Sequence, residues 1–182
     1  MNGFSFAQQR YDAVSRFFHW TFLLLLTVEF LIAWTMPDIH KGTLPKGLIS
    51  WHLFLGTFIL AMALLRVLWR LTHAAPAGLP MPHWQELAAK ITHGLLYVIL
   101  IVLPLMGWAN ASSRGWDVKL LGLLSLPALS PKGSPWGLEI GDIHQAVAIG
   151  LLVLVGLHAA AAIFHHWILR DGTLARMLPA KK

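Results

Sequence analysis

The stretch Ile143-His-Gln-Ala-Val-Ala-Ile-Gly-Leu-Leu-Val-Leu-Val-Gly-Leu-His158 carries a histidine near each end of a long apolar run. A helix has about 3.6 residues per turn and rises about 1.5 Å per residue, so His144 and His158 would share one face, roughly 21 Å apart. The hydrocarbon core of a bilayer is about 30 Å thick, so one imidazole would lie near each membrane face. Ionisable side chains inside membrane helices are energetically costly and usually functional. Two of them on one stripe indicate two stacked metal sites.

The composition is that of a membrane protein. The 182 residues are 57% hydrophobic and 12% charged, with a mean hydropathy of +0.63, whereas about 25% of residues are charged in globular proteins. The net charge of +6 comes from cations between the apolar runs, so membrane topology and lipid headgroups explain it and no nucleic-acid partner is expected. The absence of cysteine excludes disulfides, thiolate-bound haem, cysteine-bound iron–sulfur clusters and covalent c-type haem.

Four apolar segments are each long enough to cross a bilayer. They cover residues 17–36, 48–71, 91–111 and 143–169, and they predict a single all-α domain over residues 1–182, built as a four-transmembrane-helix bundle. The longest connection, residues 112–141, is predicted to be a functional outer loop, since loops of this length are commonly functional. Its apolar part, Leu120–Leu126, is expected to form a short helix on the membrane surface.

The distribution of Lys and Arg predicts that both termini face the cytoplasm. The cations of the cytoplasmic side are Arg10, Arg16, Arg66, Arg70, Lys90, Arg170, Arg176, Lys181 and Lys182. The opposite side has fewer cations, partly balanced by acidic residues: Lys41, Lys46, Arg114, Lys119 and Lys132, with Asp38, Asp117, Glu139 and Asp142.

With this topology, four histidines fall into two pairs by depth. His52 and His144 lie toward the outer face, and His19 and His158 lie toward the inner face. Facing helices of a four-helix bundle can hold a cofactor between their side chains. Imidazole also suits zinc and copper, but a zinc site needs three or four ligands at one level. Two histidines per level fit haem better. The alternative, four unrelated hydrogen-bonded core histidines, does not account for the pairing.

Two charged residues within the apolar segments can each be interpreted in two ways. Arg66 follows His52 by fourteen residues, so it shares that face of the helix at the inner depth. It could bind a haem propionate, or it could be a cytoplasmic flank. Glu29 lies past the middle of the first segment. A buried carboxylate there indicates a proton path or a polar partner, unless it reaches the outer interface.

Three further histidines are candidates for a quinone site. His93 opens the third segment with no evident partner at its depth, and it could assist a quinone, bind a propionate or make a structural hydrogen bond. His165 and His166 lie beyond His158 toward the cytoplasm. Either could supply a hydrogen bond and a proton to a quinone carbonyl, or simply lie at the level of the lipid headgroups.

Several short motifs follow one another along the chain in a specific order and spacing. They are Arg16-Phe-Phe-His19-Trp20, Ser50-Trp-His52 with Gly56, Thr92-His93-Gly-Leu-Leu-Tyr97, Pro104-Leu-Met-Gly107, Asp142-Ile-His144, Gly156-Leu-His158-Ala159-Ala160, His165-His166-Trp167 and Arg170-Asp171. In this order the chain resembles the bacterial cytochrome b561 family over nearly its whole length. The tail, Ala162-Ile-Phe-His-His-Trp167 and Leu174-Ala-Arg-Met-Leu-Pro179, resembles the branch that includes superoxide oxidase.

The resemblance implies a multi-pass protein of the bacterial inner membrane with two b haems stacked across it. One haem iron would be ligated by His19 and His158, the other by His52 and His144, and electrons would be exchanged with ubiquinone. In the superoxide oxidase branch, superoxide is oxidised at the periplasmic face and ubiquinone is the acceptor, so the resemblance implies that this chain is an oxidoreductase. The outer cations Lys41, Lys46, Arg114, Lys119 and Lys132 would attract the anion.

Two other functions stay open. The chain could be an electron-carrying cytochrome b subunit that links the quinone pool to a separate periplasmic redox partner. It could also be a purely structural or ion-conducting bundle, in which case its absorption spectrum would lack a haem Soret band.

Overall fold

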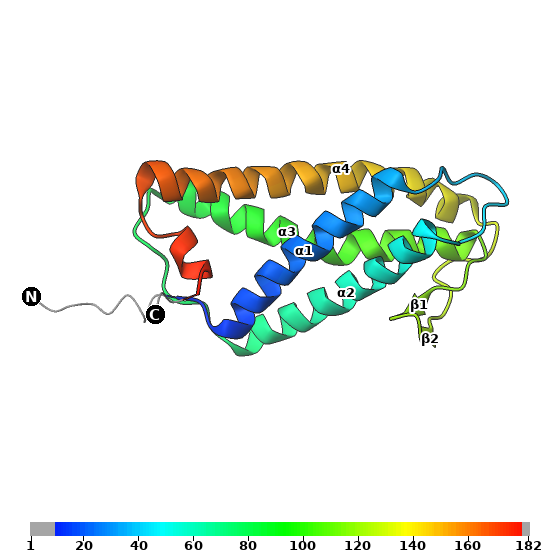
Figure 1. Ribbon diagram of the computed structural model, residues 1–182, viewed down its shortest axis with the longest axis horizontal. Coiled ribbons are helices and arrows are strands. Elements are labelled where there is room, and N and C mark those ends of the chain that lie inside the picture. Colours follow the sequence, from blue (N-terminus) through cyan, green and yellow to red (C-terminus); the bar gives the residue numbers. More distant parts are fainter. Residues whose placement is uncertain (1–9, 180–182) are drawn as a thin grey trace, which may run out of the picture.

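The computed structural model describes residues 10–179, and four long helices dominate this part of the chain (Figure 1). They are α1 (Ala13–Thr35), α2 (Leu48–Thr72), α3 (His83–Ser113) and α4 (Pro135–Phe164). A π-helical turn, His165–Leu169, continues α4, and a 3-10 turn, Leu174–Met177, follows it. Each of the four is long and apolar enough to span a membrane. The predicted all-α four-helix membrane bundle is therefore confirmed.

The third and fourth helices begin about eight residues earlier than predicted. Pro82 precedes α3, and Pro135 is the first residue of α4. Proline is favoured at the first position of a helix, which Pro135 occupies, because the first backbone N–H groups of a helix have no intrahelical acceptor. The early turns are too polar to register as membrane segments, so the hydropathy pattern misses them. The outer loop consequently runs over residues 114–134 rather than 112–141.

The apolar stretch Leu120–Leu126 is not a helix, contrary to expectation. It belongs to a two-stranded antiparallel ribbon of β1 (Lys119–Leu120) and β2 (Leu124–Ser125). Leu121 and Gly122 have φ of 53° and 71°, and two consecutive residues of positive φ make the tight turn of a hairpin instead of a helix. The Thr57 hydroxyl donates to the Lys119 carbonyl, which holds the ribbon against α2.

The four helices pack unevenly against one another. α1 packs on α2, α2 on α3 and α3 on α4, whereas α4 has few close backbone contacts with α1 or α2. The buried apolar cluster accordingly lies on α1, α2 and α3: Phe18, Phe22, Leu25, Ile59, Met62, Ala63 and Leu100. α4 therefore meets α1 and α2 mainly through side chains rather than through closely packed backbones.

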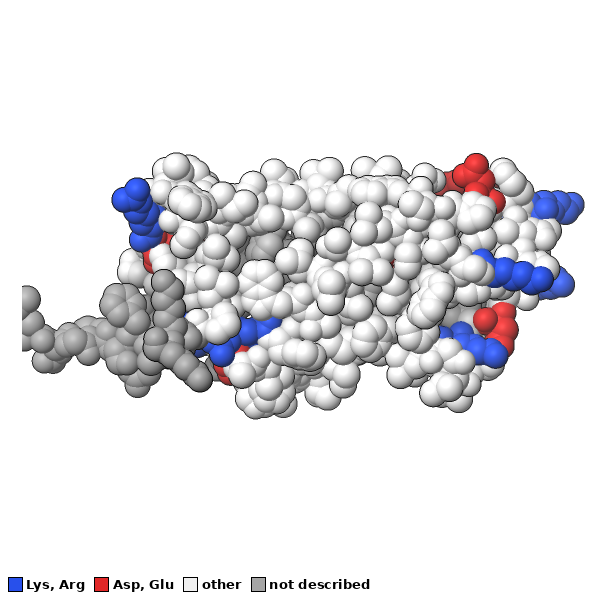
Figure 2. Space-filling view, viewed as in Figure 1, with Lys and Arg blue, Asp and Glu red and all other residues white. Residues whose placement is uncertain are grey.

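Charged side chains gather at the two ends of the bundle. In Figure 2, Lys and Arg lie at both ends of the visible face, and the band between them is almost free of charge. The first and last described residues meet at one end (Figure 1). There the Trp20 indole donates to the Met177 carbonyl at 2.9 Å, and the Tyr11 N–H donates to the Arg176 carbonyl. Lys181 and Lys182, which were among the cations used to predict that both termini face the cytoplasm, lie outside the described residues.

Candidate functional site

The structure brings together the two histidine pairs expected from the sequence. The ring centroids of His52 and His144 are 6.1 Å apart, and those of His19 and His158 are 6.0 Å apart. A metal-bound imidazole nitrogen lies roughly 2 Å from the metal and its ring centre about 1 Å further out, so two ligands on opposite sides have centroids about 6 Å apart. Both pairs therefore have the spacing of a bis-histidine site.

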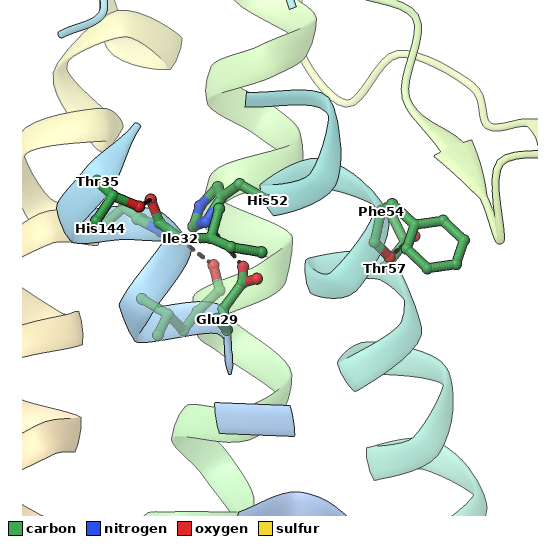
Figure 3. A network of polar contacts seen from close by, with 8 residues as sticks. Glu29, Ile32, Thr35, His52, Phe54, Thr57 and His144 are labelled. Atoms are coloured by element: carbon green, nitrogen blue, oxygen red, sulfur yellow. Dashed lines mark hydrogen bonds and ion pairs between the residues drawn. The ribbon is translucent and has the colours of Figure 1, made fainter. Parts of the chain in front are cut away.

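The Nδ1 atom of each histidine in the outer pair faces an oxygen atom, and Figure 3 shows His52 beside Glu29. His144 Nδ1 lies 3.0 Å from the Leu103 carbonyl oxygen, which can only accept. His52 Nδ1 lies 2.9 Å from Glu29 Oε1, within ion-pair distance, although the two are not aligned as a hydrogen bond. Metal-binding histidines usually direct their other ring nitrogen to a carbonyl or carboxylate. Nδ1 of His144 thus has an acceptor and Nδ1 of His52 faces a carboxylate, so in both residues Nε2 is left to bind a metal.

A cavity of about 590 Å³ adjoins the outer pair, and all four helices contribute to its lining. Among its walls are Glu29, Gly107 and Asn110 beside the two histidines, and Arg114 from the outer loop. Sites for cofactors and small molecules commonly have about 300–1,000 Å³. The cavity size, the ring spacing and the imidazole donors together fit a b haem.

The inner level holds three histidines rather than two. His93 lies beside His158, with ring centroids 5.3 Å apart, so the expectation that His93 has no partner at its depth is wrong. α3 and α4 pack closely against each other, and His93 lies on the side of α3 that faces His158 of α4. The sequence shows the position of His93 along its helix but not the side of the bundle that it faces.

Arg66 lies inside the bundle near these inner histidines. Its Nε donates to the Tyr97 hydroxyl at 3.2 Å, and its guanidinium lies over the rings of Phe22 and Tyr97. It is close enough to His19, His93 and His158 to interact electrostatically with all three. Tyr97 is a partner that sequence reasoning did not single out, although its spacing of four from His93 puts both on one face of α3.

His165 and His166 have different surroundings. The His165 Nδ1 pairs with the Asp171 carboxylate and lies 3.5 Å from the Thr173 hydroxyl. Burial tends to raise the pKa of Asp171, but hydrogen bonds from His165 and Thr173 hold that pKa below its ordinary value. His166 instead contacts Trp167, which is 69% exposed. His165 is therefore held against the fold, whereas His166 lies at its surface.

The five outer cations differ in their exposure and in the contacts of their side chains. Lys41 and Lys46 are exposed, and Lys119 Nζ lies 3.6 Å from Asp117. Arg114 donates to the Asn110 side chain and lies over the Trp116 ring, so it is held at the edge of the cavity. The stem of Lys132 lies over Gly115.

A four-span membrane bundle with two facing histidine pairs has the architecture of a haem-bearing electron-transfer protein. The model of the prokaryotic cytochrome b561 family matches residues 10–180. Cytochrome b561 homolog 1 of Escherichia coli (strain K12) is 30% identical over 180 residues, which cover 95% of this chain and 99% of that protein. A Yersinia pestis protein named probable superoxide oxidase CybB is also 30% identical, over 96% of this chain and 98% of that protein.

Cytochrome b561 homolog 2 of Escherichia coli (strain K12) is 28% identical over 96% of this chain and 94% of its own length. The chain belongs to the prokaryotic cytochrome b561 family. It is thus a multi-pass membrane protein of a family that binds b haem and transfers electrons.

Proposed function

We propose that this protein oxidises superoxide at the periplasmic side of the inner membrane and reduces ubiquinone. Two superoxide anions give up one electron each and leave as O₂, and ubiquinone takes both electrons and two protons to become ubiquinol. The observation that carries the proposal is the outer cavity, which joins the His52–His144 pair to Arg114. The likeness to a protein named probable superoxide oxidase CybB supports the same substrate.

In this proposal the chain holds two b haems, which would supply a one-electron carrier near each membrane face. His52 and His144 would ligate the outer iron, and His19 and His158 the inner one. Arg66, inside the bundle beside the inner histidines, would bind a propionate of the inner haem through charge-assisted hydrogen bonds. Both termini would lie in the cytoplasm.

The chain's own residues would handle the substrates at the two faces. The outer cations would concentrate the superoxide anion by electrostatic attraction. At the inner face, His165 would donate a hydrogen bond to a quinone carbonyl, with Asp171 fixing its ring through Nδ1. His93 and His166 are further candidates for this site. Histidine suits the role because it exchanges protons near neutral pH.

Superoxide should reduce the purified holoprotein with a second-order rate constant on the order of 10⁸ M⁻¹s⁻¹ at low ionic strength. The rate should fall as salt is added, because the Debye length shortens to about 10 Å at 0.1 M. Stopped-flow absorbance of the haem bands measures the rate, and one ubiquinol should form per two superoxide anions consumed. Slow reduction that does not respond to salt contradicts this function, and favours an electron-carrying subunit that serves a separate periplasmic partner.

The Gly107→Val variant should lose the outer haem. A Cβ at this position would lie 3.1 Å from Cε1 of His144, so a branched side chain would displace the ring that we propose as a ligand. The haem-to-protein ratio, measured as pyridine haemochrome, should fall by about half. Gly94→Val on the same helix is the control, since a Cβ there meets nothing within 4 Å. Equal haem content in the two variants would count against His144 as a ligand.

A further inference from the structure

Glu29 is the one acidic residue in the described part of α1, and its carboxylate faces α2. Its side chain is 13% exposed, and Oε1 lies 2.9 Å from His52 Nδ1. The second carboxylate oxygen, Oε2, is buried and has no hydrogen-bond partner within residues 10–179. An ionisable group is costly in a membrane helix unless it is paired or functional. The contact with His52 is therefore the feature of Glu29 that needs an explanation.

The four paired imidazoles have unequal electrostatic surroundings. His52 alone faces a carboxylate, whereas His144 faces the neutral carbonyl of Leu103. The structure gives His19 and His158 no side-chain hydrogen bond to the residues that it describes, and both lie near the positive Arg66. The outer pair thus has a carboxylate in contact with one of its rings, and Asp38, Arg114 and Asp142 line the walls of the same cavity. The charge near the inner pair is the guanidinium of Arg66.

This asymmetry has a direct consequence for redox chemistry. A carboxylate against Nδ1 holds the imidazole ring in place and makes it a stronger electron donor to the metal. Negative charge near a haem iron stabilises its oxidised state, and positive charge stabilises its reduced state, so local charge is one of the determinants of a reduction potential. The outer site should therefore have the lower potential of the two.

We infer that Glu29 is a positioning residue for His52, and that its charge lowers the reduction potential of the outer haem below that of the inner one. Electrons that enter at the outer face then move toward the inner face energetically downhill. This inference rests on the proposed ligation of the outer haem by His52 and His144. It adds a determinant of the direction of electron flow, which the spacing of the histidines leaves open.

The test compares Glu29→Gln, which removes the charge and keeps the shape, with Glu29→Asp, which keeps the charge. Glu139→Gln is the matched control, because Glu139 is an exposed acid on α4. Potentiometric titration followed by absorbance and electron paramagnetic resonance gives the potential of each haem. In Glu29→Gln the equilibrium constant for reduction of one haem should rise about tenfold, which raises its reduction potential by about 59 mV for a one-electron couple. In Glu29→Asp and Glu139→Gln it should change far less.

The shifted haem is identified by repeating Glu29→Gln in two backgrounds. With His158→Leu only the outer haem should remain, and its potential should rise, whereas with His144→Leu the remaining inner haem should not respond. If these two backgrounds do not lose different haems, it is the proposed ligation that fails. If they do and Glu29→Gln moves neither potential, the inference about Glu29 is overturned.

Haem loss is also informative. Loss of the outer haem in Glu29→Gln but not in Glu29→Asp supports the positioning role, since only the charged side chain then holds His52. Equal loss in both variants contradicts it.

Discussion

Replacing His144 with leucine is expected to leave one haem per polypeptide where the unmodified protein binds two, and His158→Leu should leave the other. The two residues belong to different pairs, and each pair has ring centroids about 6 Å apart. Leucine cannot ligate iron, and haem without one of its two axial ligands should be released or become high-spin. Pyridine haemochrome assays measure the haem content, and electron paramagnetic resonance shows which low-spin signal disappears.

The control for this experiment is His83→Leu, which changes an exposed histidine at the start of α3 and should keep both haems. The two ligand variants should also differ from each other in the signal that remains. Loss of the same haem in both would contradict the two-level arrangement. Loss of both haems together with the helical circular dichroism signal would show that the bundle itself depends on the altered histidine, and the separate ligation of two haems would then fail.

Charge reversal at Lys41, Lys46 and Lys132 is expected to slow the reduction by superoxide about tenfold or more at low salt. These are the outer lysines that form no ion pair with an acidic side chain among residues 10–179, whereas Lys119 has Asp117 beside it. Electrostatic steering changes association rates by roughly 10- to 1,000-fold and weakens at high ionic strength. The rates of the triple glutamate variant and the unmodified protein should converge near 1 M salt, where the Debye length is about 3 Å.

A variant with Arg70→Glu and Lys90→Glu reverses charges at the opposite end of the bundle and serves as the control. Its reduction by superoxide should match that of the unmodified protein, because in the proposed topology the affected charges lie across the membrane from the site of entry. Stopped-flow measurement of haem reduction, without quinone, isolates the first half of the reaction. An equal slowing by both sets of substitutions would mean that net charge, rather than the outer surface, governs the encounter.

The hydropathy pattern and the histidine spacing were enough to predict four spans and two histidine pairs. Both rest on local periodicity, which a single helix imposes on its own side chains whatever surrounds it. Helix starts were less predictable, because the first turns of α3 and α4 are polar and lie outside the apolar runs. The ribbon at Lys119–Ser125 was missed because the positive φ of Leu121 depends on the turn that it occupies, and leucine has no intrinsic preference for it.

The residues that contact the site histidines could not be predicted from the sequence. Glu29 stood out as a buried carboxylate, but its distance to His52 depends on how α1 and α2 rotate against each other. The Leu103 carbonyl belongs to the backbone, so the residue type at this position does not predict that its oxygen accepts a hydrogen bond from His144. His93 and Arg66 similarly converge on the inner pair only once the helices are packed.

The sequence by itself therefore determined the class of this protein: a four-span bundle with imidazoles at two depths, because helix periodicity and apolar length are properties of each segment alone. Only the tertiary structure decided what each imidazole faces. Helix rotation and crossing are set by the packing of whole surfaces, and that packing brings a carboxylate to the outer pair and a guanidinium to the inner one.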